Sequence, residues 1–565
     1  MNDISEIEKR AFFHALRNRL EHNHVANAKA VMGKIIQEFP DMKFNIKLAM
    51  QISSEITEKV NKLNSEGFDK AISGIGEDKF KREHESRKNV LSPIDIPNKP
   101  PVFRMAPYPS GSLHIGNSRM IILNDEYSKK YNGKLLLVMD DTIGSEEKVP
   151  LLESYDMILK DLKWMNVEYS NIFYKSDRLE LFYKWGRTVI EKGSAYVCFC
   201  TSEILRSKRE HGVECEHRNY KINENLKLWD KMLNNEYKAG EAIVRLKSSM
   251  KDPNPAFRDR VIFRISDREH PRIGKKYRVW PLLEFSWAID DVALGVTHVI
   301  RGKDLVIEDE MEKYIWKILG WNGPEFIHYG MLRIAEAKLS KSKSMKEVKS
   351  GEYLGWDDPR TWSLSSLRRR GIKPEAIRDF VLSFGTSLAD IEVPAENLYS
   401  ENRKLIDSIT PRYMYAENGA KCRIIDLPEK KEISAPLYPD DPKKETKILY
   451  GEESVILPSE DIEMHRGEII RLKDFCNVKI ATDRNCNDLF FESWENKKIP
   501  RIQWVNEKRA LECRILQTDG TIKKGYVENE ILRESEGNMA QFERYGFVRI
   551  DKIEKDNIYC WYSHP

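Results

Sequence analysis

The sequence has no apolar run near the roughly 18 residues that a membrane-spanning helix needs, which argues against a transmembrane protein. Its first twenty residues mix acidic and basic side chains without an uninterrupted apolar stretch, so they do not resemble a secretory signal. Its eight cysteines are few for 565 residues and mostly scattered, which does not suit a disulfide framework. We therefore expect a cytoplasmic protein that does not associate with membranes.

An excess of charge of one sign is also missing. The chain has 93 Lys and Arg residues against 90 Asp and Glu residues, a net charge of +3, so bulk charge does not indicate a polyanionic partner. We detect no internal repeat and no low-complexity tract. With 41% apolar and 32% charged residues, the composition is that of a globular protein, long enough for roughly three to five domains.

Helix-forming residues dominate the N-terminal part of the chain. Apolar residues spaced by four, such as Phe12, Leu16 and Leu20, predict a small helical domain over 1–90. The next segment, 91–101, holds four prolines in eleven residues, which predicts an extended linker.

Strand and helix patterns alternate after the linker. A strand pattern at 102–103, a helix pattern and the apolar run "KLLLVM" (134–139) lie within about forty residues, the spacing of a βαβ unit in a parallel sheet. The same alternation returns at 295–330, which predicts a doubly wound sheet split by an insertion. We divide the remaining chain into a first half of the sheet at 102–195, an insertion at 196–285, a second half at 286–345, a basic helical region at 346–400 and a β-rich region at 401–565.

The stretch "RMAPYPSGSLHIGNSRM" (104–120) joins the first strand to the first helix of this sheet. Gly111 and Gly116 flank "SLHI" and place a helix start beside open space, where backbone N–H groups and the helix dipole attract phosphate. His114 and Asn117, three residues apart, would donate hydrogen bonds to charge that develops on the phosphate. A lone loop histidine is more often structural, so this stretch needs a second element.

The second half of the sheet supplies that element. "AKLSKSKS" (337–344) presents Lys338, Lys341 and Lys343 among small hydroxyl residues, which suits a loop that closes over polyphosphate. Taken alone it reads as a solvated charge run. Two such elements at the ends of the two halves of one sheet indicate nucleotide chemistry.

These two stretches resemble the HIGH and KMSKS motifs of class I aminoacyl-tRNA synthetases, in the same order and separated by a large insertion. Three more stretches make the resemblance specific: "MDDT" (139–142), "DDVALGVTHVIRGKD" (290–304) and "GWDDPRTWSLSSLRRRGI" (355–372). Together they are similar to the glutamyl- and glutaminyl-tRNA synthetase group in its archaeal and eukaryotic form. The resemblance is strong over about 100–400 and weaker at both ends.

The resemblance implies a multidomain α/β protein with a split Rossmann catalytic domain, an acceptor-binding insertion, a helical stem-contact region and a C-terminal β-barrel anticodon-binding domain. It also implies adenylation of an amino acid by ATP with Mg2+, then transfer to tRNA. His114 and Asn117 would stabilise the α-phosphate transition state, and Lys341 would hold the departing pyrophosphate. The implied ATP-binding residues are Pro107, Gly111, His114, Gly116, Asn117, Lys338, Leu339, Ser340, Lys341 and Ser342.

A glutamate substrate carries two carboxylates and one ammonium group. Arg104 and Arg301 end strands of the predicted sheet at its carboxyl edge, where ligands bind in α/β proteins. The guanidinium group of arginine can donate two parallel hydrogen bonds to a carboxylate. By resemblance these arginines bind the carboxylates of glutamate, Asp140 binds the ammonium group, and Ala106 lines the same site. Leu283 stands where relatives carry Tyr, and Val292 where His is common, so one hydroxyl contact is lost.

Two further groups of residues suggest binding sites. Arg368, Arg369 and Arg370 end a predicted helix and form a candidate tRNA-phosphate patch, with a solvated helix end as the alternative. The pattern C-x-C, fourteen residues, C-x-H supplies four soft ligands for a tetrahedral structural zinc site, with buried free cysteines as the alternative. Its members are Cys198, Cys200, Cys215 and His217.

The sequence leaves the amino acid and the tRNA partly open. We expect a monomer that charges tRNA(Glu) with L-glutamate, and the sequence does not decide whether tRNA(Gln) is charged too. A glutaminyl-tRNA synthetase shares almost every motif quoted above. A shortened relative that charges a modified nucleoside is disfavoured by the roughly 165 residues after 400, and a non-catalytic tRNA-binding paralogue by His114 and "KLSKS".

Overall fold

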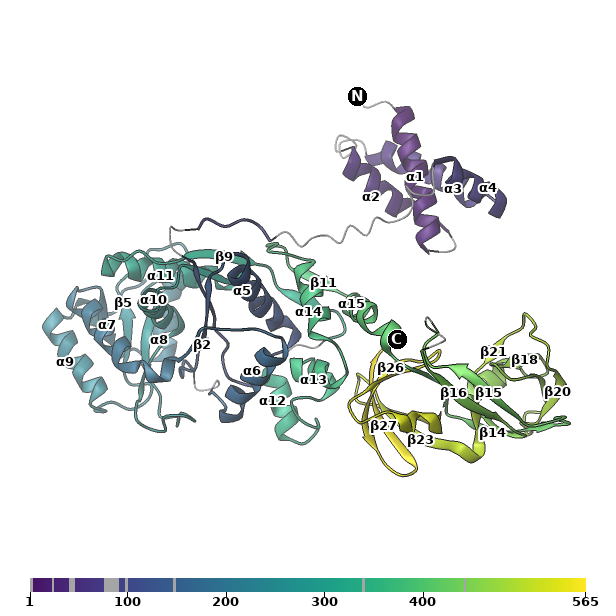
Figure 1. Cartoon of the computed structure of the whole chain (residues 1–565). Helices are drawn as coiled ribbons and strands as arrows, with labels where there is room; N and C mark the ends of the chain where they lie inside the picture. Colours follow the sequence, from purple (N-terminus) through teal and green to yellow (C-terminus); the bar gives the residue numbers. More distant parts are fainter. Residues whose placement is uncertain are drawn as a thin grey trace. The chain divides into compact units, whose positions relative to one another are not determined.

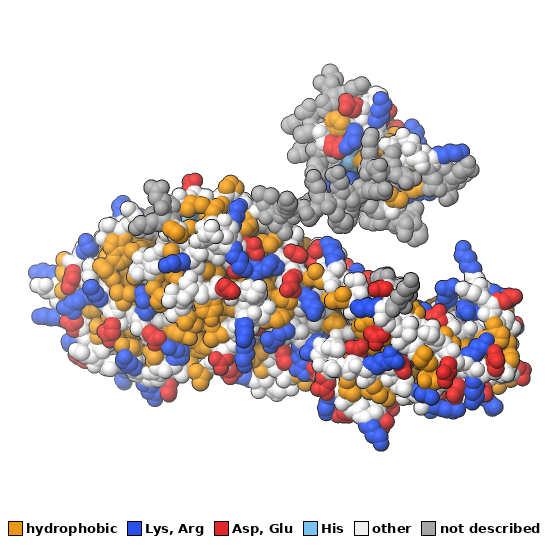
Figure 2. Space-filling model, viewed as in Figure 1, with side chains coloured by type: hydrophobic (Ala, Val, Ile, Leu, Met, Phe, Trp, Pro, Cys, Tyr) orange, Lys and Arg blue, Asp and Glu red, His pale blue; other side chains and the backbone are white. Residues whose placement is uncertain are grey.

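The computed structural model describes residues 4–22, 25–39, 46–75, 91–96, 100–145, 149–337, 341–439, 441 and 444–565. The chain divides into two compact units, Met1–Val90 and Leu91–Pro565 (Figure 1). On the face of the larger unit that Figure 2 shows, side chains of both charge signs are interspersed, in line with the nearly balanced composition.

The first unit is helical, as the sequence predicts. Its helices are α1 (Ile4–His22), α2 (Ala28–Glu38), α3 (Ile46–Asn61) and α4 (Ser65–Ile75). Leu16 is fully buried in their shared core with Ala49 and Val60, whereas Leu20, one turn further along α1, is exposed. The side chain of Asn27 begins α2 by accepting hydrogen bonds from the backbone N–H groups of Lys29 and Ala30.

A five-stranded parallel sheet organises the catalytic part of the second unit. Its strand order is β3-β2-β1-β8-β9, with β1 (Val102–Met105), β2 (Lys134–Met139), β3 (Asn171–Tyr174), β8 (His298–Gly302) and β9 (Glu325–Tyr329). Three helices connect neighbouring strands of this sheet: α5 (Ser118–Lys130), α6 (Leu152–Trp164) and α11 (Val306–Leu319). Two more lie at the joins with the insertion, α7 (Leu179–Glu191) after β3 and α10 (Leu283–Ala293) before β8. The predicted doubly wound sheet is confirmed.

The insertion forms a separate four-stranded antiparallel sheet. Its order is β4-β5-β6-β7, with β4 (Ala195–Cys198), β5 (Ile243–Leu246), β6 (Val261–Ile265) and β7 (Val279–Pro281), accompanied by α8 (Ser202–His211) and α9 (Ile222–Leu233). Phe263 and Trp229 pack edge to face in its core, with ring centroids 5.0 Å apart.

A helical region follows the second half of the parallel sheet. It contains α12 (Lys341–Lys349), α13 (Leu364–Arg369), α14 (Pro374–Leu382) and α15 (Glu396–Ile406), and a short parallel pair, β10 (Leu332–Ile334) with β11 (Ile391–Val393). Ser363 begins α13, because its Oγ accepts a hydrogen bond from the backbone N–H of Ser366. Leu364 and Leu367 face the core of the catalytic sheet.

The C-terminal region is all β apart from short helical pieces such as α16 (Ser459–Met464), and it contains two seven-stranded sheets. One sheet holds β12 (Arg412–Tyr413), β13 (Tyr415–Glu417), β23 (Ala510–Leu516), β24 (Ile522–Glu528), β25 (Met539–Phe542), β26 (Gly546–Ile553) and β27 (Asn557–His564). The other holds β14 (Ala420–Ile425), β17 (Ser454–Leu457), β18 (Ile469–Leu472), β19 (Asn477–Ile480), β20 (Leu489–Ser493), β21 (Arg501–Ile502) and β22 (Val505–Asn506), and β15 (Lys431–Pro436) pairs with β16 (Thr446–Gly451). The β-rich architecture is confirmed, with its strands divided between two curled sheets.

Across the described ranges, no helix combines the length and apolar character needed to cross a membrane. The domain boundaries given above remain predictions.

Candidate active site

The site lies where the parallel sheet reverses its winding. From β1 the chain winds through β2 to β3 on one side, and β8, which pairs with β1, leads to β9 on the other. At such a switch point the loops after the two central strands diverge and leave a crevice at the carboxyl edge. Arg104 in β1 and Arg301 in β8 therefore come to one place, although almost two hundred residues separate them.

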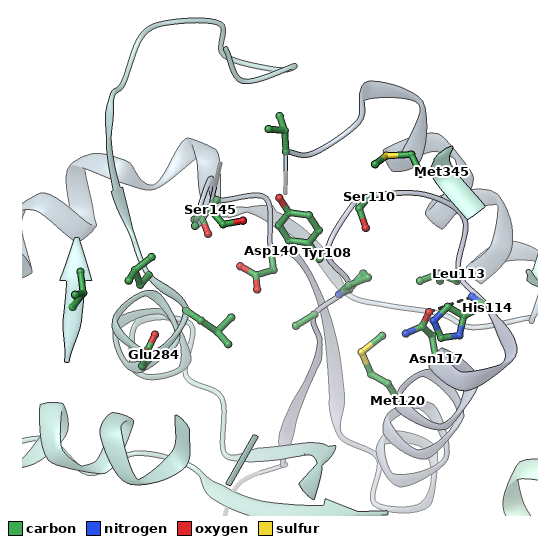
Figure 3. Close-up of a pocket in the computed structure, with 18 of the residues that line it drawn as sticks. Tyr108, Ser110, Leu113, His114, Asn117, Met120, Asp140, Ser145, Glu284 and Met345 are labelled. Carbon is green, nitrogen blue, oxygen red and sulfur yellow. Dashed lines mark hydrogen bonds between the residues drawn. The ribbon is translucent and has the colours of Figure 1, made fainter. Parts of the chain in front are cut away.

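The helix start after β1 is held by a reciprocal pair of hydrogen bonds. The backbone N–H of Gly116 donates to His114 Nδ1 at 3.1 Å. The backbone N–H of His114 donates to Asn117 Oδ1 at 3.2 Å (Figure 3). This is a capping box built from a histidine and an asparagine. Because Nδ1 accepts, the imidazole proton is on Nε2, and because Oδ1 accepts, Asn117 keeps Nδ2 as a donor.

Two adjoining cavities of about 620 and 1080 Å³ open around this helix start. The smaller cavity lies over the ends of β1 and β8, and the larger one extends to Arg209 and Arg260 of the insertion. Leu283, which stands where relatives carry Tyr, lines both cavities with an apolar side chain. The predicted site residues that line one or both cavities are Arg104, Ala106, Pro107, His114, Gly116, Asn117, Asp140 and Arg301.

The remaining predicted ATP-binding residues differ in their placement. Gly111 packs against Trp356: a Cβ at Gly111 would lie 2.3 Å from Trp356 Cη2, and its φ of +149° suits glycine. Lys338, Leu339 and Ser340 lie outside the described residues. Lys341 and Ser342 begin α12, and their side chains also lie outside the described part. Met345 of α12 lines the larger cavity, so this helix reaches the site (Figure 3).

Arg104 is almost fully buried and its guanidinium group is fixed from α10. Its Nε and Nη2 donate to the two carboxylate oxygens of Asp291 at 2.7 and 2.9 Å, and its Cζ lies 3.5 Å from the ring centroid of Trp287. A bidentate pair of this kind sets both the position and the plane of the guanidinium group. The part of Arg104 left for a ligand is Nη1.

Arg301 is held in a similar way by α11. Its Nε donates to Asp309 Oδ1 at 2.9 Å and its Nη2 donates to Glu312 Oε1 at 2.9 Å. Burial raises the pKa of Glu312 to about 7, against the opposing effect of Arg301. Glu312 Oε2 has no hydrogen-bond partner in the described structure. Arg301 therefore pairs with two carboxyl groups, and one of them, that of Glu312, has a pKa close to neutral pH.

Asp140 directly follows β2 and already contacts an ammonium group. Lys175 Nζ lies 2.9 Å from Asp140 Oδ1, donates to Ser286 Oγ at 2.7 Å and lies 3.5 Å from the ring centroid of Trp287. Lys175 is fully buried, and burial lowers its pKa. The carboxylate predicted to bind the ammonium group of the substrate is therefore partly neutralised from within the protein.

The sequence reading missed the residues that hold the predicted ligands. Asp309 and Glu312 are three apart on α11, so they share a helix face, but an acidic helix segment usually indicates solvent. Lys175 follows a strand pattern with no motif around it. The pair Asp290–Asp291 lies within the stretch "DDVALGVTHVIRGKD", but its burial on α10 is a property of the folded chain that no local sequence pattern indicates.

The predicted tRNA contacts at the end of α13 are partly corrected. Arg370 is 0% exposed and donates to the backbone carbonyls of Tyr562 and Ser563, so it cannot reach a phosphate in this structure. Arg369 is half-buried and donates to both carboxylate oxygens of Asp551. Arg368 is exposed, and its phosphate contact, like that of Arg369, stays a prediction.

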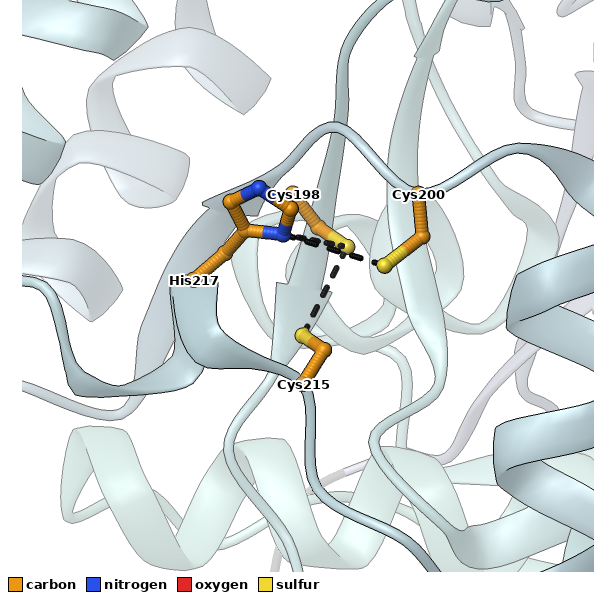
Figure 4. A group of neighbouring side chains, drawn as sticks. All are labelled: Cys198, Cys200, Cys215 and His217. Atoms are coloured by element: carbon orange, nitrogen blue, oxygen red, sulfur yellow. Dashed lines mark hydrogen bonds between the residues drawn. The ribbon is translucent and has the colours of Figure 1, made fainter.

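The four predicted metal ligands meet in the insertion (Figure 4). The sulfurs of Cys198 and Cys215 lie 3.8 Å apart, and His217 Nδ1 lies 3.8 Å from Cys198 Sγ and 3.7 Å from Cys200 Sγ. A tetrahedral zinc with Zn–S bonds of about 2.3 Å separates its sulfurs by about 3.8 Å. The donor set and its spacing therefore fit a tetrahedral metal ion.

A split, doubly wound parallel sheet with a glycine-bordered histidine at its switch point, and a lysine-rich segment later in the sequence, is the arrangement of a class I aminoacyl-tRNA synthetase. Comparison with known families is more specific. The model described as "tRNA synthetases class I (E and Q), catalytic domain" matches residues 102–408, and those described as "anti-codon binding domain" of the same class match 410–490 and 501–551. The chain belongs to this family.

Curated relatives match nearly the whole chain. A glutamate–tRNA ligase of Methanocaldococcus jannaschii is 41% identical over 97% of this chain and 98% of its own length. One from Pyrococcus furiosus is 41% identical over 99% of this chain and 100% of its own. One from Archaeoglobus fulgidus is 38% identical over 96% and 97%.

Replacement of Glu312 tests the charge balance at Arg301. Because the pKa of Glu312 is raised in the folded chain, its contribution to stability is complete below its unfolded value of 4.5 and is lost as the pH rises through about 7. We expect Glu312→Gln to gain stability relative to the unaltered chain between pH 5 and pH 8, measured as the urea midpoint. Glu310→Gln, on the exposed face of α11, is the control, and parallel curves for E312Q and the unaltered chain would contradict the account.

Proposed function

We propose that this chain attaches L-glutamate to tRNA. ATP and glutamate form glutamyl-adenylate with release of pyrophosphate, and the glutamyl group then passes to the terminal adenosine of tRNA with release of AMP. The observation that carries the proposal is similarity to glutamate–tRNA ligases over nearly the full length of both chains. The two adjoining cavities at the carboxyl edge of the sheet supply room for both substrates.

The capping box provides two donors for the α-phosphate. His114 Nε2 and Asn117 Nδ2 belong to side chains that line both cavities and whose other polar atoms are held by backbone N–H groups. Donors fixed in this way stabilise developing charge without reorganisation during the reaction. Lys341, at the start of α12, would hold the pyrophosphate, and Mg2+ bound to ATP would offset the phosphate charge.

The smaller cavity suits glutamate. Arg104 and Arg301 would bind its carboxylates, Asp140 its ammonium group, and Ala106 leaves space beside them. Because the two arginines already pair with Asp291, Asp309 and Glu312, their position is set before glutamate arrives. This preorganisation lowers the ordering cost of binding.

The larger cavity suits the acceptor end of tRNA. Arg209 and Arg260 bring positive charge from the insertion to the cavity that His114 and Asn117 also line. The C-terminal sheets, which match anticodon-binding models, would bind the other end of the tRNA. We propose tRNA(Glu) as the substrate, and tRNA(Gln) as a second substrate to be tested separately.

Aminoacylation with labelled amino acids tests the function. The purified full-length chain, ATP and Mg2+ are combined with tRNA(Glu) or tRNA(Gln) and with labelled glutamate or glutamine. We expect glutamate to be attached to tRNA(Glu). Attachment of glutamine alone would overturn the proposal in favour of a glutaminyl-tRNA synthetase, and absence of any charging would favour a non-catalytic tRNA-binding protein.

We propose further that Cys198, Cys200, Cys215 and His217 hold a structural zinc ion. The ion would tie the end of β4 to the 3₁₀ turn that contains His217. The buried Arg245 supports this, because its Nη1 lies 3.6 Å from Cys215 Sγ and 3.9 Å from Cys198 Sγ and would offset the charge of three thiolates.

Metal analysis tests the zinc proposal. We expect about one zinc per purified chain, and a value well below half in Cys215→Ser, together with a lower melting temperature. Cys486→Ser, in the C-terminal region, is the matched control and should keep the metal. A chain purified without zinc that loses no thermal stability in a chelator would contradict the proposal.

A further inference from the structure

The loop that carries His114 is bound along one edge by a distant segment. The backbone N–H of Ile115 donates to the Trp362 carbonyl at 3.1 Å, and the backbone N–H of Leu364 donates to the Leu113 carbonyl at 2.7 Å. His114 and Ser363 therefore face each other in a two-residue antiparallel bridge. The position of the His114 backbone depends on the conformation of this segment, here called the bridge segment (361–364).

The bridge segment contains a strained residue. Trp362 has φ of 50° and ψ of 27°, in the left-handed region, and it is 4% exposed. A bulky side chain is a clear outlier there, because its Cβ crowds the backbone. Such a conformation persists only when its surroundings enforce it. The residues packed around Trp362 therefore hold the bridge segment in this conformation.

Arg370 is one of the residues that pack around Trp362. Its Cζ lies 5.2 Å from the ring centroid of Trp362, and the Tyr399 ring stacks at 6.4 Å on the same side chain. Arg370 Nη2 donates to Tyr399 Oη at 2.8 Å and to the Ser563 carbonyl at 2.6 Å, and Nε donates to the Tyr562 carbonyl at 3.2 Å. Within the described ranges no carboxylate pairs with it, so its charge is buried against neutral oxygens and two aromatic rings, which is a costly arrangement.

The acceptors of Arg370 belong to the end of β27, the last strand of the chain. That end is fixed in turn by α15, because Asn402 Nδ2 donates to His564 Nε2 at 2.9 Å and the Tyr399 and His564 rings stack at 5.3 Å. The approach is close: a Cβ at Gly371 would lie 2.0 Å from Met539 Sδ of β25. The C-terminal sheet thus packs directly against the residues that follow α13.

We propose that Arg370 is a positioning residue for His114. It ties the end of β27 to Trp362, maintains the left-handed turn of the bridge segment and thereby fixes the backbone of the His114 loop. Only the six-residue helix α13, about 9 Å long, separates Arg370 from the bridge segment. The inference rests on the proposed role of His114 in adenylate formation.

A double-mutant cycle measures this coupling. Glutamate-dependent ATP–pyrophosphate exchange, with tRNA present, is measured for the full chain, Arg370→Lys, His114→Ala and the double variant. Lysine keeps the charge but lacks the fork that holds three acceptors. We expect Arg370→Lys to lower kcat about tenfold with both KM values changed less than twofold, since small misplacements of catalytic groups have large effects on rate. His114→Ala should lower kcat roughly 10²- to 10³-fold.

The decisive quantity is the effect of Arg370→Lys in the His114→Ala background, which should fall below twofold. A loss of folded protein would reduce both backgrounds equally, so equal decreases, or no decrease in either, overturn the inference. If Arg370→Lys does not fold, Tyr399→Phe decides in its place: it removes one acceptor, keeps the stacking, and should lower kcat about threefold only when His114 is present.

Arg544→Lys is the control, because the fork of Arg544 also holds more than one acceptor, the two carboxylate oxygens of Asp461, but it does so within the C-terminal region alone. It should leave exchange unchanged. Absence of exchange by the unaltered chain would overturn the proposed function and this inference with it. If the unaltered chain shows normal exchange but the effects of Arg370→Lys and His114→Ala on kcat are additive, only this inference is overturned.

Discussion

The ion pair between Arg104 and Asp291 joins the two halves of the catalytic sheet. Arg104 belongs to β1 and Asp291 to α10, 187 residues later, and both are buried. Removing one partner of such a pair leaves an uncompensated buried charge, which costs about 3–5 kcal/mol. The insertion between the two halves can be large because this contact, together with the pairing of β1 and β8, restores the sheet. Arg104 also lines the smaller cavity at the switch point, so the same contact positions one wall of the crevice.

The charges around the crevice are arranged in pairs before any substrate binds. Arg301 pairs with Asp309 and Glu312, and Asp140 with Lys175, so each charged residue predicted to bind glutamate has a protein partner of opposite charge. This neutralises groups that would otherwise be costly to bury. It also means that glutamate must fit groups already fixed in place, which favours a substrate with charges at matching positions over one of similar size without them.

Local patterns in the sequence predicted the parts of this site that belong to single strands and loops. The strand ends at Arg104 and Arg301, the glycine-bordered His114 and the cysteine pattern were readable because their residues are adjacent or regularly spaced. Asp291, Glu312 and Lys175 could not be predicted in this way, because their role as partners depends on burial, and burial is determined only when the chain folds. Arg370 shows the same limit: beside two other arginines it reads as a phosphate contact, yet it is enclosed by a strand almost two hundred residues later. Residues 338–340 of the lysine-rich stretch 337–344 lie outside the described residues, so the role of that stretch stays a prediction.

The central claim is that the crevice at the carboxyl ends of β1 and β8 binds glutamyl-adenylate, with His114 and Asn117 at its phosphate. A crystal structure of the full chain with a non-hydrolysable glutamyl-adenylate analogue tests it most directly. The account predicts His114 Nε2 and Asn117 Nδ2 within about 3 Å of the group that replaces the phosphate, with the glutamyl carboxylate at Arg301. An analogue bound with its phosphate mimic away from both side chains, or with its glutamyl group outside the smaller cavity, would contradict the account.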